Sequence, residues 1–174
     1  MDEAAIRRSM TRITHEIIEK NNGTEDLCLL GIRRRGVPLA AILQENLKLF
    51  EGKTIPLGSV DISLYRDDLS ELSDTAQTGT SEIPFDITGK KVILVDDVIY
   101  TGRTARAAIE AVIHRGRPRL IQLAVLVDRG HRELPIRADF VGKNVPTAAR
   151  ETVSVQLAEM DGEEKVVLGE IVEE

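Results

Sequence analysis

The 174-residue sequence is poor in several features that would assign it to other classes of protein. It has one cysteine, Cys28, which excludes an internal disulfide; its place in the apolar run 27–32 predicts a buried, unreactive thiol and favours the cytosol. No apolar stretch approaches the roughly 20 residues of a membrane span, and the N-terminus lacks the basic start and apolar core of a signal peptide. We therefore expect a cytoplasmic protein with no membrane partner.

The chain also has no overall excess of positive charge. Its net charge of −6 argues against a general nucleic-acid binder. The charges are unevenly distributed, because residues 112–150 hold eight Lys or Arg against three Asp or Glu, whereas residues 151–174 hold one against eight. A local basic surface can therefore exist on this acidic protein.

The hydropathy pattern predicts one α/β domain spanning residues 1–174, because 42% hydrophobic residues suffice for a single core. Runs of apolar residues without alternation predict a mostly parallel sheet flanked by helices. The segment Ser70 to Glu82 has almost no large apolar residue, so we expect a mobile excursion there. The predicted helices are 4–21, 38–50 and 105–115. The predicted strands of the sheet are 27–32, 55–64, 92–95, 120–127 and 138–141. Residues 152–157 and 165–172 are predicted to form a hairpin around Asp161-Gly162.

The most informative segment is 92–104, Val-Ile-Leu-Val-Asp-Asp-Val-Ile-Tyr-Thr-Gly-Arg-Thr. Four consecutive aliphatic residues predict a buried strand that stops at Asp96 and Asp97 and then turns through Thr101-Gly102 into a helix. Ligands of parallel sheets bind beyond the carboxyl ends of the strands. This segment is therefore the first candidate for a binding site.

The residue types in this turn suit a ribose 5-phosphate. Thr101, Gly102 and Thr104 offer N–H groups and hydroxyls at the positive end of a helix dipole, which favours a phosphate. Asp96 and Asp97 can accept hydrogen bonds from vicinal ribose hydroxyls or approach a phosphate-bound metal through water. The alternative is that the acids only end a strand and a threonine only caps the helix. A Walker-type site is a weaker alternative still, because no G-x-x-x-x-G-K-[ST] pattern occurs and no Lys follows Gly102.

Two other loops and one helix face carry candidate binding groups. Arg33, Arg34 and Arg35 follow a buried strand, so we expect them at the same sheet edge, where three guanidiniums suit pyrophosphate; the alternative is a solvated basic turn. The pair Tyr65-Arg66 is either a lid or an ordinary loop. In the first helix, a polar stripe opposes the apolar one and consists of Arg8, Thr11, Arg12, His15 and Glu19.

The segment 92–104 resembles the phosphoribosyl pyrophosphate (PRPP) motif of type I phosphoribosyltransferases. Segments 127–139 (Val-Asp-Arg-Gly-His-Arg-Glu-Leu-Pro-Ile-Arg-Ala-Asp) and 142–147 are similar to the PyrR family, the bifunctional pyrimidine-operon attenuation regulators and uracil phosphoribosyltransferases. The similarity extends over most of the chain and includes 6–8, 11–13, 15–16, 61–62 and 64–69.

The resemblance implies a type I phosphoribosyltransferase fold with a flexible loop and a small hood. It implies that the protein converts uracil and PRPP to UMP and pyrophosphate with Mg2+. It also implies binding to the leader of pyrimidine-operon mRNA when UMP or UTP is abundant, and a homodimer or higher homo-oligomer.

Position by position, the resemblance also implies roles for individual residues. The catalytic residues would be Asp96 and Asp97, on the ribose hydroxyls, and Arg35. Magnesium would be held through PRPP, with no direct protein ligand. PRPP would further contact Arg33, Arg34, Arg66, Thr101, Gly102, Arg103 and Thr104. The RNA surface would involve Thr11, Arg12, His15, Arg132, Arg137 and Lys143.

Two other functions remain open from the sequence. One is a plain salvage phosphoribosyltransferase for a purine or orotate, without an RNA role. The other is an RNA regulator that keeps the pocket as a nucleotide sensor without turnover. The base that the protein prefers, and the polar stripe with Arg12 and His15, distinguish a PyrR protein from a plain salvage enzyme. The intact acid pair and arginine loop argue against a regulator that has lost turnover.

Overall fold

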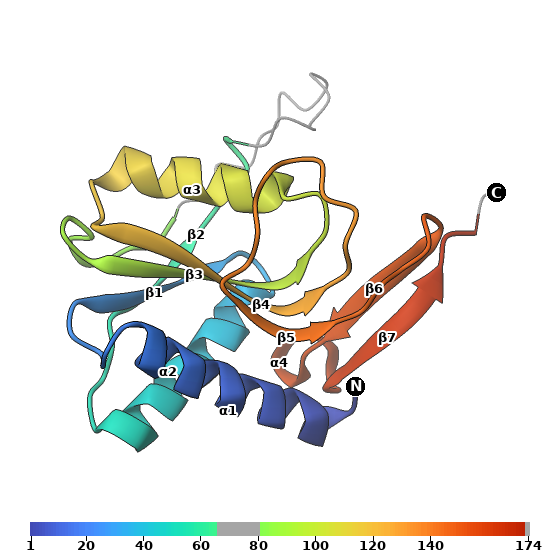
Figure 1. Cartoon of the computed structure of the whole chain (residues 1–174), viewed down its shortest axis with the longest axis horizontal. Helices are drawn as coiled ribbons and strands as arrows, with labels where there is room; N and C mark the ends of the chain where they lie inside the picture. The colour runs from blue at the N-terminus through green and yellow to red at the C-terminus, as the bar shows by residue number, and fades with distance from the viewer. Residues whose placement is uncertain (66–80, 173–174) are drawn as a thin grey trace.

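A five-stranded parallel sheet forms the centre of the structure, a computed structural model that describes residues 1–65 and 81–172 (Figure 1). Helices α1 (Glu3–Lys20) and α2 (Gly36–Glu51) cover one face, and α3 (Arg103–Arg115) covers the other. This arrangement confirms the predicted fold class. In the spatial order of the sheet, the strands are β2 (Leu57–Val60), β1 (Leu27–Ile32), β3 (Lys91–Ile99), β4 (Leu120–Asp128) and β5 (Phe140–Asn144).

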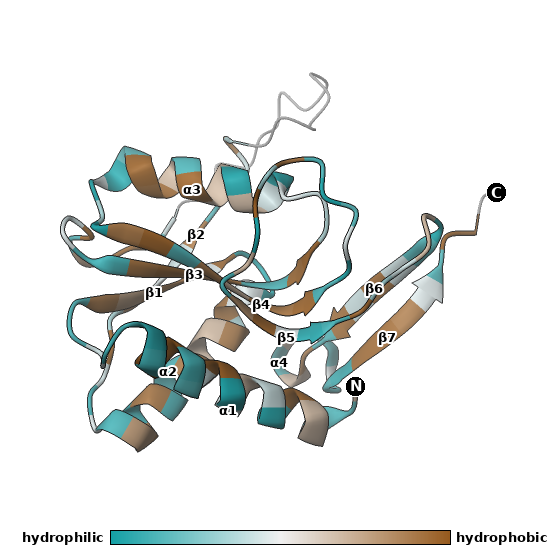
Figure 2. Cartoon of the chain, viewed as in Figure 1, coloured by the Kyte–Doolittle hydropathy of each residue, from teal (hydrophilic) through white to brown (hydrophobic). Residues whose placement is uncertain are grey.

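Each inner strand contributes to two cores, because successive side chains point to opposite faces. Leu27 and Leu29 pack with α1 and α2, whereas Cys28 and Leu30 pack on the α3 side. Figure 2 shows the resulting apolar strands between helices whose outer faces are polar. Cys28 is buried as predicted, and burial raises the pKa of its thiol to about 11, so the thiol stays protonated and unreactive at neutral pH.

The C-terminal segment forms the predicted hairpin as a separate two-stranded antiparallel sheet, the hood. It consists of β6 (Glu151–Gln156), the short helix α4 (Ala158–Asp161) and β7 (Lys165–Glu170). Met1 pairs with Val166 through two backbone hydrogen bonds of 3.0 and 2.9 Å. The hood is therefore tied to the start of α1, and it projects beyond the end of the main sheet (Figure 1).

Three sequence predictions need correction. The strand predicted at 55–64 is only β2, because Pro56 has no N–H for the ladder and the chain turns at Ser63–Tyr65. The strand predicted at 138–141 begins and ends later, as β5. The acids do not end β3, which continues to Ile99 because β4 runs beside it as far as the Ile99–Asp128 pair.

The polar excursion predicted at Ser70 to Glu82, together with Arg66, falls mostly in residues 66–80, outside the described residues. Its last residue, Glu82, pairs with Ser59 through backbone hydrogen bonds of 2.8 and 3.0 Å. Within residues 1–65 and 81–172, no helix is both long and apolar enough to cross a membrane.

Candidate active site

The two acids lie in β3 beyond the end of its neighbour β1. Strand β1 pairs with β3 only as far as Gly31–Val95, so Asp96 and Asp97 have β4 alone beside them. Val95 and Val98 both pack on the α1/α2 side, although residues three apart in a regular strand face opposite sides. The alternation of the strand is therefore interrupted at the acid pair.

The carboxylates of the acid pair turn back towards the backbone. Asp96 accepts a hydrogen bond of 2.9 Å from the N–H of Asp97, and Asp97 accepts one of 2.8 Å from the N–H of Val98. Burial, and then the negative charge of Asp97, raise the pKa of Asp96 well above its usual range. A ligand that brings hydroxyl donors or a cation to this edge would stabilise the charged form.

The arginine loop, residues 33–35, lies directly against the acid pair. The following residue, Gly36, touches β3 so closely that a Cβ there would stand 2.1 Å from the Val95 carbonyl oxygen and 3.3 Å from the Asp96 Cα. The structure thus brings the loop and the acids to one sheet edge, as was predicted from the position of both segments at the ends of buried strands. The Arg33–Arg34 peptide bond is cis.

Within this loop the three arginines have different surroundings. Arg35 makes a two-pronged ion pair with Asp161 of the hood, with 3.1 Å between Nη2 and Oδ1. This hydrogen bonding raises the pKa of Arg35 and lowers that of Asp161, and the charge of Asp97 also acts on Arg35. Arg33 donates to Ser59 Oγ at 3.3 Å and pairs with Glu82 at 3.3 Å, whereas Arg34 is exposed. The hood is therefore clamped to the arginine loop through Arg35.

Substituting Gly36→Ala is expected to destabilise the protein by about 1–3 kcal/mol, the usual cost of overpacking, because the new Cβ meets backbone that cannot move aside. Turnover should fall as well, since the arginine loop shifts relative to the acids. Urea unfolding measures the first effect. The control is Gly169→Ala, whose Cβ meets only the Thr152 hydroxyl at 3.2 Å. Equal stability of the two variants would contradict the close contact.

The phosphate loop, Thr101–Thr104, connects β3 to α3. The helix begins at Arg103 after Gly102, whose φ of 93° is left-handed and therefore favours glycine. The first-turn N–H groups of a helix have no carbonyl partner within the helix, and Thr101 Oγ1 accepts one of them, from Arg103, at 3.3 Å. The loop therefore joins a helix N-terminus to the same sheet edge as the acids and arginines.

The candidate RNA residues on α1 lie beside β5. Arg12 donates to the carbonyl oxygens of Val141, at 3.2 Å, and Gly142, and it also pairs with Glu16 at 2.9 Å. Lys20 pairs with Asp139 at 3.0 Å, immediately before β5. The exposed stripe of α1 is thus held against the segment that carries two further candidates, the exposed Arg137 and Lys143. Arg132 differs, because its side chain is only 22% exposed and pairs with Asp128 at 2.6 Å.

Several residues at or near the site were not found from the sequence. Asp161 was seen only as part of a hairpin turn, and no local pattern links it to Arg35. Phe50 of α2 stacks on His15, with ring centroids 4.5 Å apart. The buried Arg129 lies over the Tyr100 ring at 4.0 Å. Each depends on contacts between distant segments, which no local spacing encodes.

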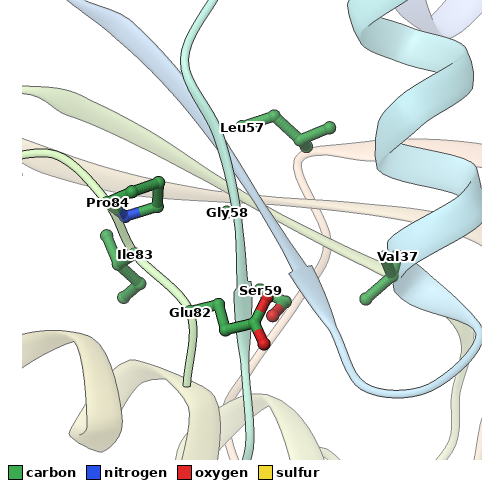
Figure 3. Close-up of a pocket in the computed structure, with 7 residues that line it drawn as sticks. All are labelled: Val37, Leu57, Gly58, Ser59, Glu82, Ile83 and Pro84. Atoms are coloured by element: carbon green, nitrogen blue, oxygen red, sulfur yellow. The ribbon is translucent and has the colours of Figure 1, made fainter. Parts of the chain in front are cut away.

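A cavity of about 530 Å³ lies beside the edge strand β2, between segment 82–84 and Val37 (Figure 3). It is lined mostly by apolar groups, and its one charged lining side chain is the carboxylate of Glu82. A carboxylate and apolar groups do not suit a phosphate, so this cavity is not a candidate anion site.

Comparison with known proteins agrees with this geometry. Residues 2–159 match the family described as the phosphoribosyl transferase domain. The chain belongs to the phosphoribosyltransferase family. Proteins named bifunctional protein PyrR are similar over nearly the whole length. One from Pelotomaculum thermopropionicum is 63% identical over 173 residues, covering 99% of this chain and 96% of that protein, and one from Clostridium perfringens strain SM101 is 61% identical over 170 residues, covering 98% and 96%.

These identities place this phosphoribosyltransferase among the PyrR proteins and confirm the resemblance found in the sequence. Solved phosphoribosyltransferases share its fold. The hypoxanthine phosphoribosyltransferase of Trypanosoma cruzi has a TM-score of 0.73 at 21% identity, covering 97% of this chain and 93% of that one. A hypoxanthine-guanine phosphoribosyltransferase of Bacillus anthracis has a TM-score of 0.71 at 19% identity, covering 98% and 96%.

Proposed function

We propose that this PyrR protein has two activities: it transfers the ribosyl 5-phosphate group of PRPP to uracil, giving UMP and pyrophosphate, and it binds the leader of pyrimidine-operon mRNA in response to UMP or UTP. The observation that carries the proposal is the full-length identity of about 60% to bifunctional PyrR proteins. The convergence of the acid pair, the arginine loop and the phosphate loop at one edge supports the enzymatic half. The protein acts in the cytoplasm as a homodimer or higher homo-oligomer.

In the enzymatic reaction the phosphate loop holds the 5-phosphate, and the acid pair accepts hydrogen bonds from the ribose hydroxyls. The arginine loop binds pyrophosphate, which competes with Asp161 for the guanidinium of Arg35. The proposal also gives Arg66, which is outside the described residues, a contact with pyrophosphate. As the bond between C1 and pyrophosphate breaks, positive charge builds on the ribose ring close to the two carboxylates. The protein contributes mainly positioning and electrostatics, without a covalent nucleophile.

Magnesium fits this site as a companion of PRPP. The acid pair offers hard oxygen ligands, which Mg2+ prefers, and the pair can approach a phosphate-bound ion through water. In the proposed complex Asp96 and Asp97 are the protein groups nearest the ion, which is held through PRPP. When bound, the ion neutralises charge on the departing pyrophosphate.

A turnover assay with PRPP, Mg2+ and each of five bases tests the enzymatic half. We expect uracil to be converted to UMP, with little reaction of orotate, hypoxanthine, guanine or adenine. Preference for one of the other four bases would indicate a plain salvage enzyme. Specific binding of leader RNA without any turnover would indicate a regulator that uses the pocket only as a sensor.

The RNA half of the proposal rests on the basic side chains along α1 and β5. Arg12 and Lys20 on the helix contact the segment carrying Arg137 and Lys143, whereas His15 stacks on Phe50 of α2. Because UMP tightens RNA binding, linkage requires RNA to tighten UMP binding by the same factor. Titrating each ligand in the presence and absence of the other measures that factor in two independent ways.

A further inference from the structure

The segment 129–137, which follows β4, packs against the phosphate loop. The backbone N–H groups of Glu133 and Leu134 both donate to the Thr101 carbonyl oxygen, at 2.9 and 3.2 Å. The Cα of Gly102 faces the same segment, since a Cβ there would lie 3.4 Å from Arg132 Cδ and 3.5 Å from Ile136 Cβ. The position of the phosphate loop is therefore set by residues about 30 positions further along the chain.

Arg132 makes the strongest of these connections. Its guanidinium donates to the Tyr100 carbonyl oxygen at 2.7 Å and to Asp128 Oδ2 at 2.6 Å. The other carboxylate oxygen of Asp128 accepts the Gly130 N–H at 2.9 Å, so this side chain is itself held at the end of β4. Arg132 thus links the end of β4 to the last residue before the phosphate loop.

A direct RNA contact is favoured by a guanidinium that is well exposed to solvent, as that of Arg12 is at 49%. The side chain of Arg132 is 22% exposed and that of its partner Asp128 is 14% exposed. Arg137, on the same segment, is exposed and makes no ion pair within residues 1–65 and 81–172. The two arginines therefore have different physical roles although the sequence groups them together.

We propose that Arg132 is a positioning residue for the phosphate site, acting through the Tyr100 carbonyl, and does not contact RNA directly. By fixing Tyr100, Arg132 holds the N–H groups of the phosphate loop in place for the ligand's 5-phosphate. This inference rests on the proposed function, which identifies the ligand as PRPP or UMP.

The same segment connects the phosphate loop to the RNA surface. It runs on to Asp139, whose carboxylate accepts from Lys20 of α1 at 3.0 Å and from the Leu123 N–H at 2.8 Å. One end of segment 129–139 therefore contacts the loop at Thr101–Thr104, where the phosphate would bind. The other end contacts α1, where the RNA would bind. Loss of Arg132 should reduce the tightening of RNA binding by UMP and leave RNA affinity without nucleotide unchanged.

The test compares the affinities for UMP and for uridine, which differ only in the 5-phosphate. Isothermal titration is performed on wild type, Arg132→Ala, Arg132→Met, Arg132→Lys and the charge-matched control Arg119→Ala, an exposed residue at the opposite end of β4. We expect Arg132→Ala to weaken UMP binding about tenfold or more with little change for uridine. Arg132→Lys should restore part of the loss, and Arg119→Ala should match wild type.

The UMP-to-uridine affinity ratio separates positioning from general damage to the fold, because misfolding weakens both ligands equally. If Arg132→Ala does not fold, Arg132→Met, which has a similar length but cannot donate to the Tyr100 carbonyl oxygen, provides the same comparison. An unchanged ratio together with weaker RNA binding in the absence of UMP would overturn the inference and make Arg132 an RNA contact. Failure of the wild type to bind UMP would overturn the proposed function as well.

Discussion

Replacing Asp96 and Asp97 together by Asn is expected to lower kcat/KM for UMP synthesis by roughly 10²- to 10⁴-fold. Hydrogen bonds to charged groups contribute about 1.5–3 kcal/mol each, and in the proposed reaction the two carboxylates bind the ribose, where positive charge develops in the transition state. Steady-state assays with PRPP and uracil measure the loss. The control is Glu25→Gln with Glu45→Gln, two exposed acids outside the site, which removes the same charge. Unchanged turnover in the Asp96/Asp97 variant would remove both acids from the mechanism.

The same variant is expected to be at least as stable as wild type at neutral pH. Burial and the charge of Asp97 raise the pKa of Asp96 in the folded state above its value in the unfolded chain. The stabilising effect of Asp96 is therefore present in acid and is lost as the pH rises through the folded pKa. Asn cannot ionise, so the variant avoids this loss. Urea unfolding at pH 5 and pH 8 should show wild type losing more stability between them than the variant does.

Replacing Arg12 by Ala is expected to weaken binding of pyrimidine-operon leader RNA by more than tenfold, while uracil turnover stays within about twofold of wild type. The exposed stripe of α1 lies on the side of the helix that faces away from the core, apart from the sheet edge that holds the acids. His15→Ala should behave in the same way. If Arg12 contacts a phosphate, the slope of log K against log salt should also fall by about one.

Arg12 also donates to two carbonyl oxygens of β5, so its loss could weaken RNA binding by disturbing this strand. A control variant must separate that structural effect from the loss of an RNA contact. Arg12→Lys keeps the charge but cannot bridge both the Val141 and Gly142 carbonyl oxygens as the guanidinium does. Arg119→Ala removes the same charge from an exposed position just before β4, away from α1, and we expect it to bind RNA almost as wild type does. Normal leader binding by Arg12→Ala and His15→Ala, or no specific binding by wild type with saturating UMP, would leave only a salvage enzyme.

Much of the fold was predictable because local patterns encode it. The unbroken apolar runs at 27–32 and 92–95 predicted buried parallel strands, and the structure confirms both as parts of β1 and β3. The 3.6-residue spacing of Ile6, Met10, Ile13 and Ile17 predicted the buried face of α1 correctly. Because parallel strands end at a common edge, the sequence also predicted that the acids and the arginine loop meet there.

The structure changed the description of that edge. The acids lie within β3 and not after it, because the length of a strand depends on how far its neighbour extends. The cavity beside β2 and the interrupted alternation at Asp96 likewise depend on how whole elements pack. None of these features has a signature in a window of a few residues.

The sequence by itself determined the fold class, the site-forming loops and the family, because hydrophobic periodicity, glycine positions and contiguous motifs are local properties of the chain. Only the tertiary structure decided how individual charges are used: Arg35 pairs with Asp161, Arg132 links Asp128 to Tyr100, and Arg12 caps β5. Arg35 and Asp161 lie 126 positions apart, and Arg12 and Val141 lie 129 apart. Such pairings arise from the packing of the complete fold, so the spacing of residues along the chain does not specify them.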